Sequence, residues 1–347
     1  MTALTALTVL VTATAPRVAQ AQAQPQATGA DCLALIDDAA RLACYDRLHG
    51  RSAAPPTLPT SPALLPDPTP APAPQRPQPS PLSQRWDLDG QRGALFAPRA
   101  HQPVYILPAT WTDRVNDRPS SPAPAHSATE DLALKAVEVK YQLSLKAKFA
   151  HSVLGTPASL WGGYTQSSRW QVYNGAISRP FRETNYEPEL MLVWPLSLPL
   201  GGWDLRMASL TLNHQSNGRS LPLSRSWNRV IASVAAERND WAAEVRAWTR
   251  IRERSDADDN PDVEDFIGRG EVRISRYWGN HALSVQARHS LRSGTASRGS
   301  TQLDYVFPIT GALHGYLQVF NGHGESLVDY NLRQTKLGLG VTIAGWR

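Results

Sequence analysis

Residues 137–149 read Val-Glu-Val-Lys-Tyr-Gln-Leu-Ser-Leu-Lys-Ala-Lys-Phe, and this stretch decides the fold class. Its odd-numbered positions are apolar and its even-numbered positions are polar or charged. Because successive side chains of a β-strand point to opposite faces, the pattern predicts a long strand with one apolar and one polar face. A helix of the same sequence would scatter both classes of side chain around its circumference.

The same alternation recurs toward the C-terminus, for example at 241–251, 283–288 and 336–343. Many of these strands exceed the ~5–6 residues usual in globular sheets, including soluble β-sandwiches. They match the roughly 9–11 residues that a strand needs to cross a bilayer at a tilt. We therefore predict an all-β transmembrane antiparallel barrel of about 12 strands over residues 135–347, with a polar lumen and both termini on the periplasmic side.

The composition agrees with a membrane barrel and excludes two other classes of protein. Eleven Trp and ten Tyr outnumber six Phe, and such amphipathic rings suit membrane–water interfaces. After the N-terminus no run of about 18 apolar residues occurs, so a transmembrane helix is not expected. The net charge of +5 is spread along the chain without a dense basic patch. Nucleic acid is therefore not an expected partner.

The N-terminus has the features of an exported chain. Residues 1–23 are rich in Ala, Thr, Leu and Val and contain Ala-x-Ala twice, which predicts a secretory signal peptide. The chain has only two cysteines, Cys32 and Cys44, inside a segment over 24–50 that we expect to be helical. In an exported chain this even number predicts one disulfide.

Two further segments precede the predicted barrel. Of the 27 residues from Pro55 to Pro81, 12 are proline. Proline fixes φ and lacks an N–H donor, so we predict an extended linker over 51–84. Residues 85–134 show little periodicity and are expected to form an irregular lead-in or a plug-like arm.

A candidate catalytic site lies inside a second alternating stretch. His214 and Ser216 share the parity of Leu210 and Leu212, which puts them on the lipid-facing side of the predicted strand. Asn228 opens the next alternating stretch on the same outer face. Serine needs a base within hydrogen-bond reach, and an amide oxygen can hold the second N–H of that histidine. Spacing alone leaves the alternative that all three are interfacial polar residues, because the Gly-x-Ser-x-Gly motif is absent.

Five motifs then stand in order along the second part of the chain. They are Tyr164–Gln166, Ser178–Glu189, His214–Ser220 followed by Ser224–Arg229, Asp258–Asp262, and Gly324–Asn331. Over residues 135–347 they resemble the outer membrane phospholipase A family. The resemblance implies a twelve-stranded outer-membrane barrel that hydrolyses the sn-1 and sn-2 acyl ester bonds of phospholipids and lysophospholipids, depends on calcium and is active as a homodimer.

The resemblance also implies a role for single residues. Ser216 is then the nucleophile, His214 the base and Asn228 its orienting partner, and the backbone N–H of Gly218 helps to hold the oxyanion. A calcium ion would be held by Arg219, Ser224 and Ser178 of the partner subunit. Asp259 is a further candidate ligand, with a turn residue as its alternative role.

The resemblance leaves two points open. Gln166 is expected on the face of the barrel that meets the second subunit. Leu221 stands where members of the family commonly have aspartate, which puts a secondary calcium site in question. The alternative function is a non-catalytic porin-like or structural barrel, although twelve strands leave only a small lumen.

Overall fold

The computed structural model describes residues 29–50, 80–89 and 93–344. The predicted signal peptide and most of the predicted linker lie outside these residues. Residues 29–50 belong to one compact unit and the residues from 80 onward to another. No helix within the described ranges is both long and apolar enough to cross a membrane.

The first unit is a helical pair. α1 (Gly29–Leu33) and α2 (Asp38–Leu48) are joined by a disulfide between Cys32 and Cys44, as predicted. The side chain of Asp37 accepts a hydrogen bond from the backbone N–H of Ala40, which caps the first turn of α2. So short a pair buries little apolar surface, and the disulfide therefore supplies a large share of its stability.

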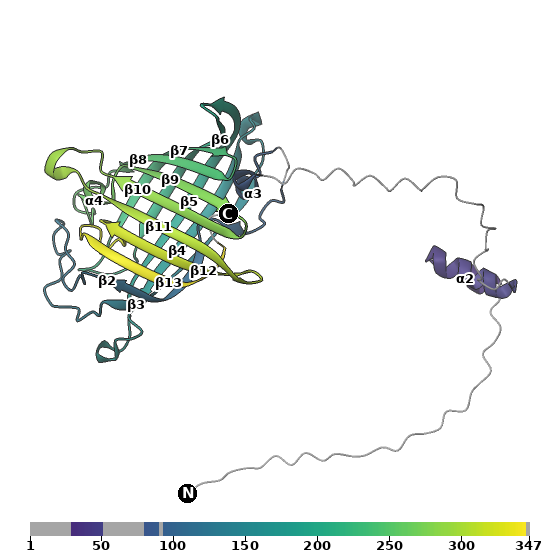
Figure 1. Ribbon diagram of the computed structural model, residues 1–347, viewed down its shortest axis with the longest axis horizontal. Helices are drawn as coiled ribbons and strands as arrows, with labels where there is room; N and C mark the ends of the chain where they lie inside the picture. Colours follow the sequence, from purple (N-terminus) through teal and green to yellow (C-terminus); the bar gives the residue numbers. More distant parts are fainter. Residues whose placement is uncertain (1–28, 51–79, 90–92, 345–347) are drawn as a thin grey trace, which may run out of the picture. The chain divides into compact units, whose positions relative to one another are not determined.

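The second unit is a closed antiparallel barrel of twelve strands, β2 to β13 (Figure 1). Neighbouring strands pair in chain order, and β13 pairs with β2 to close the ring. The two-residue strand β1 (Arg99–Ala100) adds to β3. The barrel strands are β2 (Val104–Thr112), β3 (Val137–Ala150), β4 (Ser159–Trp170), β5 (Phe181–Leu200), β6 (Trp203–Ser216), β7 (Ser226–Arg238), β8 (Trp241–Ile251), β9 (Gly270–Trp278), β10 (His281–His289), β11 (Gly299–Thr310), β12 (Leu313–Gly322) and β13 (Gln334–Ala344). The predicted fold class is confirmed.

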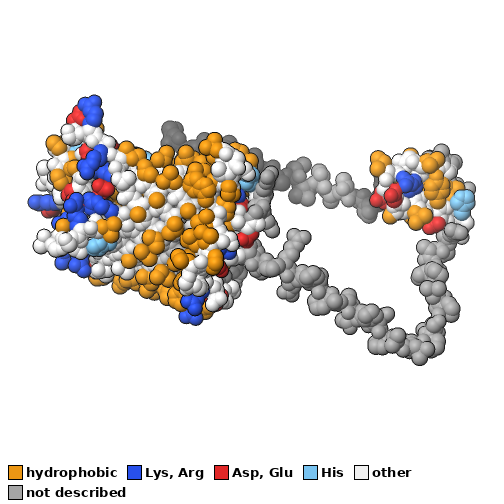
Figure 2. Space-filling view, turned by 90° about the horizontal axis from the view of Figure 1, so that it is seen from above, with side chains coloured by type: hydrophobic (Ala, Val, Ile, Leu, Met, Phe, Trp, Pro, Cys, Tyr) orange, Lys and Arg blue, Asp and Glu red, His pale blue; other side chains and the backbone are white. Residues whose placement is uncertain are grey.

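The alternating pattern sets the inner and outer faces of the barrel. On β3 the side chains of Leu143 and Leu145 are exposed, whereas Lys140 and Lys146 are buried in the lumen. Figure 2 shows apolar side chains over the barrel wall and charged side chains gathered at one end. This arrangement reverses that of a soluble protein and suits a wall surrounded by lipid.

The two ends of the barrel differ. One end has two-residue turns, such as those between β5 and β6 and between β7 and β8. The other end carries the long connections, including α4 (Val263–Ile267) and two of the short 3-10 helices, η2 (Gly175–Ile177) and η3 (Gly294–Ala296). The third, η1 (Val153–Gly155), lies between β3 and β4. α3 (Pro81–Trp86) and α4 lie at opposite ends (Figure 1).

The predicted linker over 51–84 is wrong at its C-terminal end. There α3 begins after Ser80, whose side chain accepts a hydrogen bond from the backbone N–H of Ser83. Pro81 at the first helical position is compatible with a helix, because that N–H needs no intrahelical partner. Leu82 and Trp86 are buried in an apolar cluster with residues of β4, β5, β6 and β7. α3 therefore fills the turn-side end of the lumen.

The predicted irregular lead-in over 85–134 is also wrong in part, because it contains β2. The pairing of β2 with β3 shifts between Leu107 and Thr110, so the strand bulges at Pro108. Proline is tolerated at such bulges. Before the bulge the odd-numbered residues Tyr105 and Leu107 are buried, and after it the even-numbered Thr110 is buried. The change of parity removes the alternation by which the other strands were predicted.

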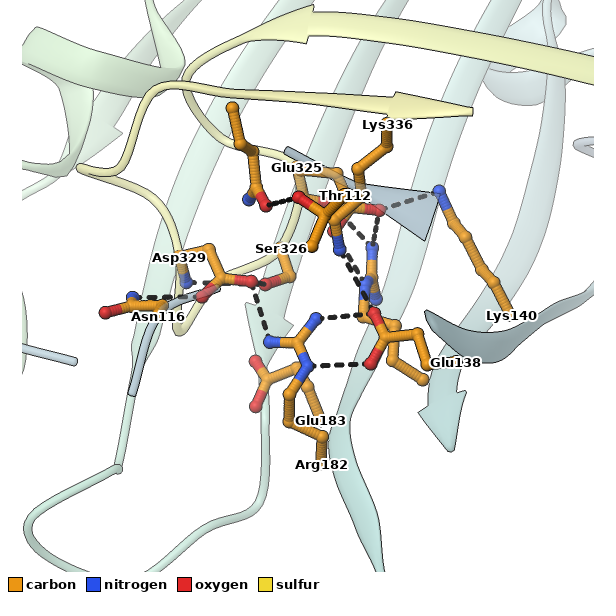
Figure 3. Close-up of polar contacts among 12 residues, drawn as sticks. Thr112, Asn116, Glu138, Lys140, Arg182, Glu183, Glu325, Ser326, Asp329 and Lys336 are labelled. Atoms are coloured by element: carbon orange, nitrogen blue, oxygen red, sulfur yellow. Dashed lines mark hydrogen bonds and ion pairs between the residues drawn. The ribbon is translucent and has the colours of Figure 1, made fainter. Parts of the chain in front are cut away.

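Charged side chains fill the middle of the lumen. Glu325 forms ion pairs with Lys140, Arg169 and Lys336, and Lys336 also contacts Glu138 (Figure 3). A polar pocket in the lumen, lined mainly by charged and amide side chains, has a volume of about 140 Å³. A barrel filled in this way leaves no wide pore within the described residues.

Candidate functional site

The three predicted catalytic residues lie together on the outer wall. His214, near the end of β6, is the register partner of Asn228 at the start of β7. The ring Nδ1 of His214 is 2.8 Å from Oδ1 of Asn228. Leu210 and Leu212, on the same face of β6, are exposed on the barrel surface. The site is therefore flanked by apolar wall and lies near the end with the long connections.

The hydrogen bonds of Asn228 fix the tautomer of His214. The Nδ2 group of Asn228 donates to Oε1 of Glu253 at 2.7 Å, so its Oδ1 faces the histidine. An amide oxygen only accepts, and therefore Nδ1 of His214 carries the hydrogen of that bond. In the neutral ring Nε2 is then the nitrogen that can take up a proton.

Ser216 is the last residue of β6 and lies two residues beyond His214 on the same face. Its register partners are Tyr186 on β5 and Ser226 on β7. Gly218 follows with a φ of 59°, a left-handed conformation that suits glycine. The backbone N–H of Gly218 has no hydrogen-bond partner among the residues that the structure describes, as a candidate oxyanion donor requires.

Asn217 holds the β6–β7 connection in shape. Its backbone N–H donates to the carbonyl of Arg225 at 3.0 Å, and its Nδ2 donates to the carbonyl of Leu223 at 2.7 Å. Its Oδ1 accepts from the backbone N–H groups of Arg219 and Arg225. The side chain is buried. Asn217 thus orders the segment that carries Gly218 and two of the candidate calcium ligands, Arg219 and Ser224.

Asp259 anchors one of the candidate calcium ligands. Its Oδ2 accepts a hydrogen bond from Oγ of Ser224 at 2.6 Å, and its Oδ1 lies 3.0 Å from Nε2 of His126. Ser224, Asp259 and the backbone carbonyl of Arg219 would all bind a metal ion through oxygen atoms. Oxygen ligands fit a hard cation such as calcium. The described residues contain no group of three or more His, Cys, Asp or Glu side chains placed to hold a metal ion.

Ser178 and Leu221 both lie on exposed connections. Ser178 follows directly after η2 with a φ of 62°, and its side chain is exposed between β4 and β5. Within the described residues of one chain, no hydrogen bond joins Ser178 to Ser224 or Asp259. Leu221 is 56% exposed in the β6–β7 connection and supplies no side-chain oxygen.

Gln166 lies on the outer face of β4 in the same row as Ser216. Gln166 pairs with Tyr186, and Tyr186 pairs with Ser216. Two strand spacings, or about 10 Å, therefore separate Gln166 from Ser216 along the barrel wall. Leu143, the partner of Gln166 on β3, is exposed. A polar amide in this apolar surface is suited to a specific protein contact.

Sequence reasoning missed Asn217, His126 and Glu253. Asn217 stands inside a quoted motif, but its burial follows from the fold of the loop. His126 comes from the long β2–β3 connection, and nothing in the sequence indicates that it reaches Asp259. Only Glu253 could have been found from the sequence. It shares the outer parity of Ile251, which is the register partner of Asn228.

Comparison with protein families matches residues 82–343 to the phospholipase A1 family. The match begins at α3 and includes β2, ahead of the start at residue 135 that the motifs indicated. A Neisseria meningitidis protein assigned as a phospholipase A1 is 37% identical over 350 residues, covering 90% of each chain. Phospholipase A1 of Escherichia coli is 41% identical over 206 residues, covering 59% of this chain and 69% of its own.

Two solved structures are similar to the barrel. An active-site mutant of outer membrane phospholipase A from Escherichia coli superposes with a TM-score of 0.65 at 35% identity, covering 75% of this chain and 96% of its own. The outer membrane phospholipase of Salmonella typhi, a dimer with bound calcium, has a TM-score of 0.65 at 35% identity and covers 74% of this chain and 96% of its own.

Proposed function

The chain belongs to the phospholipase A1 family, and from that membership we propose that it hydrolyses sn-1 and sn-2 acyl ester bonds of phospholipids and lysophospholipids with a Ser216–His214–Asn228 triad. The observation that carries the proposal is the 2.8 Å contact between His214 and Asn228 on the lipid-facing wall. An ester in the surrounding bilayer can reach such a site without leaving the membrane.

The triad accounts for both steps of the reaction, the acylation of Ser216 and the hydrolysis of the acyl-serine. Oγ of Ser216 attacks the ester carbonyl while Nε2 of His214 takes its proton, and Asn228 holds the opposite N–H. The N–H of Gly218 stabilises the negative charge that develops on the carbonyl oxygen. His214 then returns the proton to the glycerol oxygen as the C–O bond breaks. A water molecule activated by His214 hydrolyses the acyl-serine and frees the fatty acid.

Calcium and a second copy of the chain complete the proposed site. Ser224 and the carbonyl of Arg219, with Asp259 behind Ser224, would hold the ion together with Ser178 of the partner subunit. When bound there, calcium would supply positive charge to the site. Gln166, about two strands from Ser216, would lie in the dimer contact. The exposed position of Ser178 supports a role across the interface, because it is free to meet another chain.

Chelation of calcium is expected to lower activity and the dimer population together. With ligands divided between two chains, removal of the ion weakens both the site and the contact. Fatty acid release and chemical crosslinking of the detergent-solubilised protein can be followed across a titration with a calcium chelator. Equal activity with and without excess chelator would contradict the calcium role.

The test of the proposed function is hydrolysis by the refolded protein. Purified protein in detergent should release fatty acid from phospholipid micelles in the presence of calcium. The porin-like alternative predicts steady ion conductance in planar bilayers instead. The filled lumen favours the enzyme, because its central pocket of about 140 Å³ is lined by charged side chains. Conductance without hydrolysis would support the alternative.

We further propose that the barrel lies in an outer membrane, with residues 29–50 on the periplasmic side. Val104 at the start of β2 pairs with Ala344 at the end of β13, so both ends of the barrel chain lie at the end with tight turns. In bacterial outer-membrane barrels that end is periplasmic. Protease added to intact cells should spare residues 29–50 and cleave them after the outer membrane is permeabilised. Cleavage in intact cells would reverse the assigned orientation.

A further inference from the structure

Glu253 lies beside the proposed triad without belonging to it. It follows the end of β8 by two residues and shares the outer parity of Ile251. Ile251 is the register partner of Asn228, and Asn228 is the register partner of His214. Glu253 therefore stands two residues beyond the row formed by His214, Asn228 and Ile251. Oε1 of Glu253 accepts the hydrogen bond from Nδ2 of Asn228 at 2.7 Å.

The carboxylate determines which way the amide of Asn228 points. An ionised carboxylate only accepts hydrogen bonds, so it must face the NH₂ group of the amide. The oxygen of Asn228 is then turned toward Nδ1 of His214. With a flipped amide, NH₂ would face Nδ1 and favour the tautomer in which Nε2 carries the hydrogen and cannot accept the serine proton.

The surroundings of Glu253 hold its carboxyl group in place. Its Oε2 lies 3.7 Å from Nη2 of Arg250, and that guanidinium is itself held by Asp258 at 2.5 Å and by the carbonyl of Asn260 at 3.1 Å. The side chain of Glu253 is 21% exposed. Burial raises the pKa of Glu253, as do Asp258 and Asp259, while Arg250 and the bond from Asn228 oppose that rise.

We propose that Glu253 is a positioning residue of the hydrolytic site, which acts through Asn228 to orient His214 and to supply the negative charge that a neutral asparagine lacks. The inference rests on the triad proposed above. In Ser-His-Asp triads a carboxylate directly behind the histidine stabilises the imidazolium that forms during the reaction. Here the carboxylate stands one residue further back and stabilises the same charge through a polarised amide.

The test compares two variants of Glu253 with a control in the same loop. Glu253→Ala removes the acceptor and the charge, whereas Glu253→Gln removes the charge and keeps the size. Asp256→Asn serves as the matched control, because Asp256 is an exposed carboxylate that pairs with Arg254. All three would be refolded in detergent beside wild type and Ser216→Ala and compared by circular dichroism before assay.

We expect Glu253→Ala to lower kcat about tenfold or more with little change in KM, since hydrogen bonds to charged groups contribute more than neutral ones. Glu253→Gln should fall between Glu253→Ala and wild type. The acidic limb of kcat against pH should move to lower pH in both variants, because a nearby carboxylate favours the protonated imidazole. Asp256→Asn should keep the kcat and the acidic limb of wild type.

The outcomes separate this inference from the proposed function. If Ser216→Ala is inactive but both Glu253 variants keep the wild-type kcat and acidic limb, the positioning role is wrong and the triad stands. If Ser216→Ala keeps full activity, the triad itself is wrong. A loss of kcat without any movement of the acidic limb would indicate a purely structural residue and would also overturn the inference. If Glu253→Ala does not fold, the kcat and acidic limb of the nearly isosteric Glu253→Gln variant test the positioning role.

Discussion

Replacing Ser216 by alanine is expected to abolish fatty acid release from phospholipid micelles while the barrel still forms. The change removes one oxygen from a half-buried position at the end of β6 and leaves the strand pairing with β5 and β7 intact. Loss of a nucleophile in a triad lowers kcat by at least about a thousandfold, since the other members cannot replace it. Titration of released fatty acid on refolded protein measures the effect.

The control for this prediction is a serine on the opposite face of the same strand. Ser209 lies in the lumen, where its hydroxyl contacts that of Ser233 at 2.7 Å. Ser209→Ala makes the same chemical change in β6 but leaves the outer wall untouched, so it should keep full activity. Substantial hydrolysis by the Ser216 variant, folded as judged by circular dichroism, would rule out the assigned nucleophile.

Most of the barrel could be predicted from the sequence because each strand residue has one of two environments. In β3 and β6 an apolar side chain meets lipid and a polar one meets the lumen, so the local pattern carries the assignment. β2 could not be found in this way, since the bulge at Pro108 changes the parity within the strand. α3 could not be predicted either, because the proline-rich sequence before it indicates an extended chain. Its burial depends on contacts with strands that are distant in the sequence.

The residues of the candidate site likewise fall into those that strand parity could place and those that it could not. His214, Ser216 and Asn228 could be placed on one outer face from strand parity, and motif resemblance supplied their roles. Asn217 and Glu253 depend on how the connections after β6 and β8 fold, and strand periodicity carries no information about those connections. The contact between Asp259 and Ser224 joins residues 35 positions apart. It therefore depends on the pairing of β7 with β8 as well as on the motifs themselves.

Glu325→Ala is expected to be the most damaging single substitution for stability. Glu325 has a side chain only 1% exposed, and its carboxylate lies 2.8 Å from Lys140 and 2.9 Å from both Arg169 and Lys336 (Figure 3). Without it, three cations remain close together in the lumen with no central anion. Breaking a buried ion pair by removing one partner costs about 3–5 kcal/mol. Urea unfolding of the refolded protein should show a correspondingly lower midpoint.

The matched control removes an exposed carboxylate of the same chain. Asp131 pairs with Arg118, and both side chains are more than half exposed. Surface pairs of this kind contribute about 0–1 kcal/mol, so Asp131→Ala should barely move the unfolding midpoint. Equal midpoints for the two variants would mean that water or rearranged side chains compensate the cations of the lumen. A lower midpoint for Glu325→Ala alone would show that the three buried cations of the lumen need the carboxylate of this loop residue as their counter-charge.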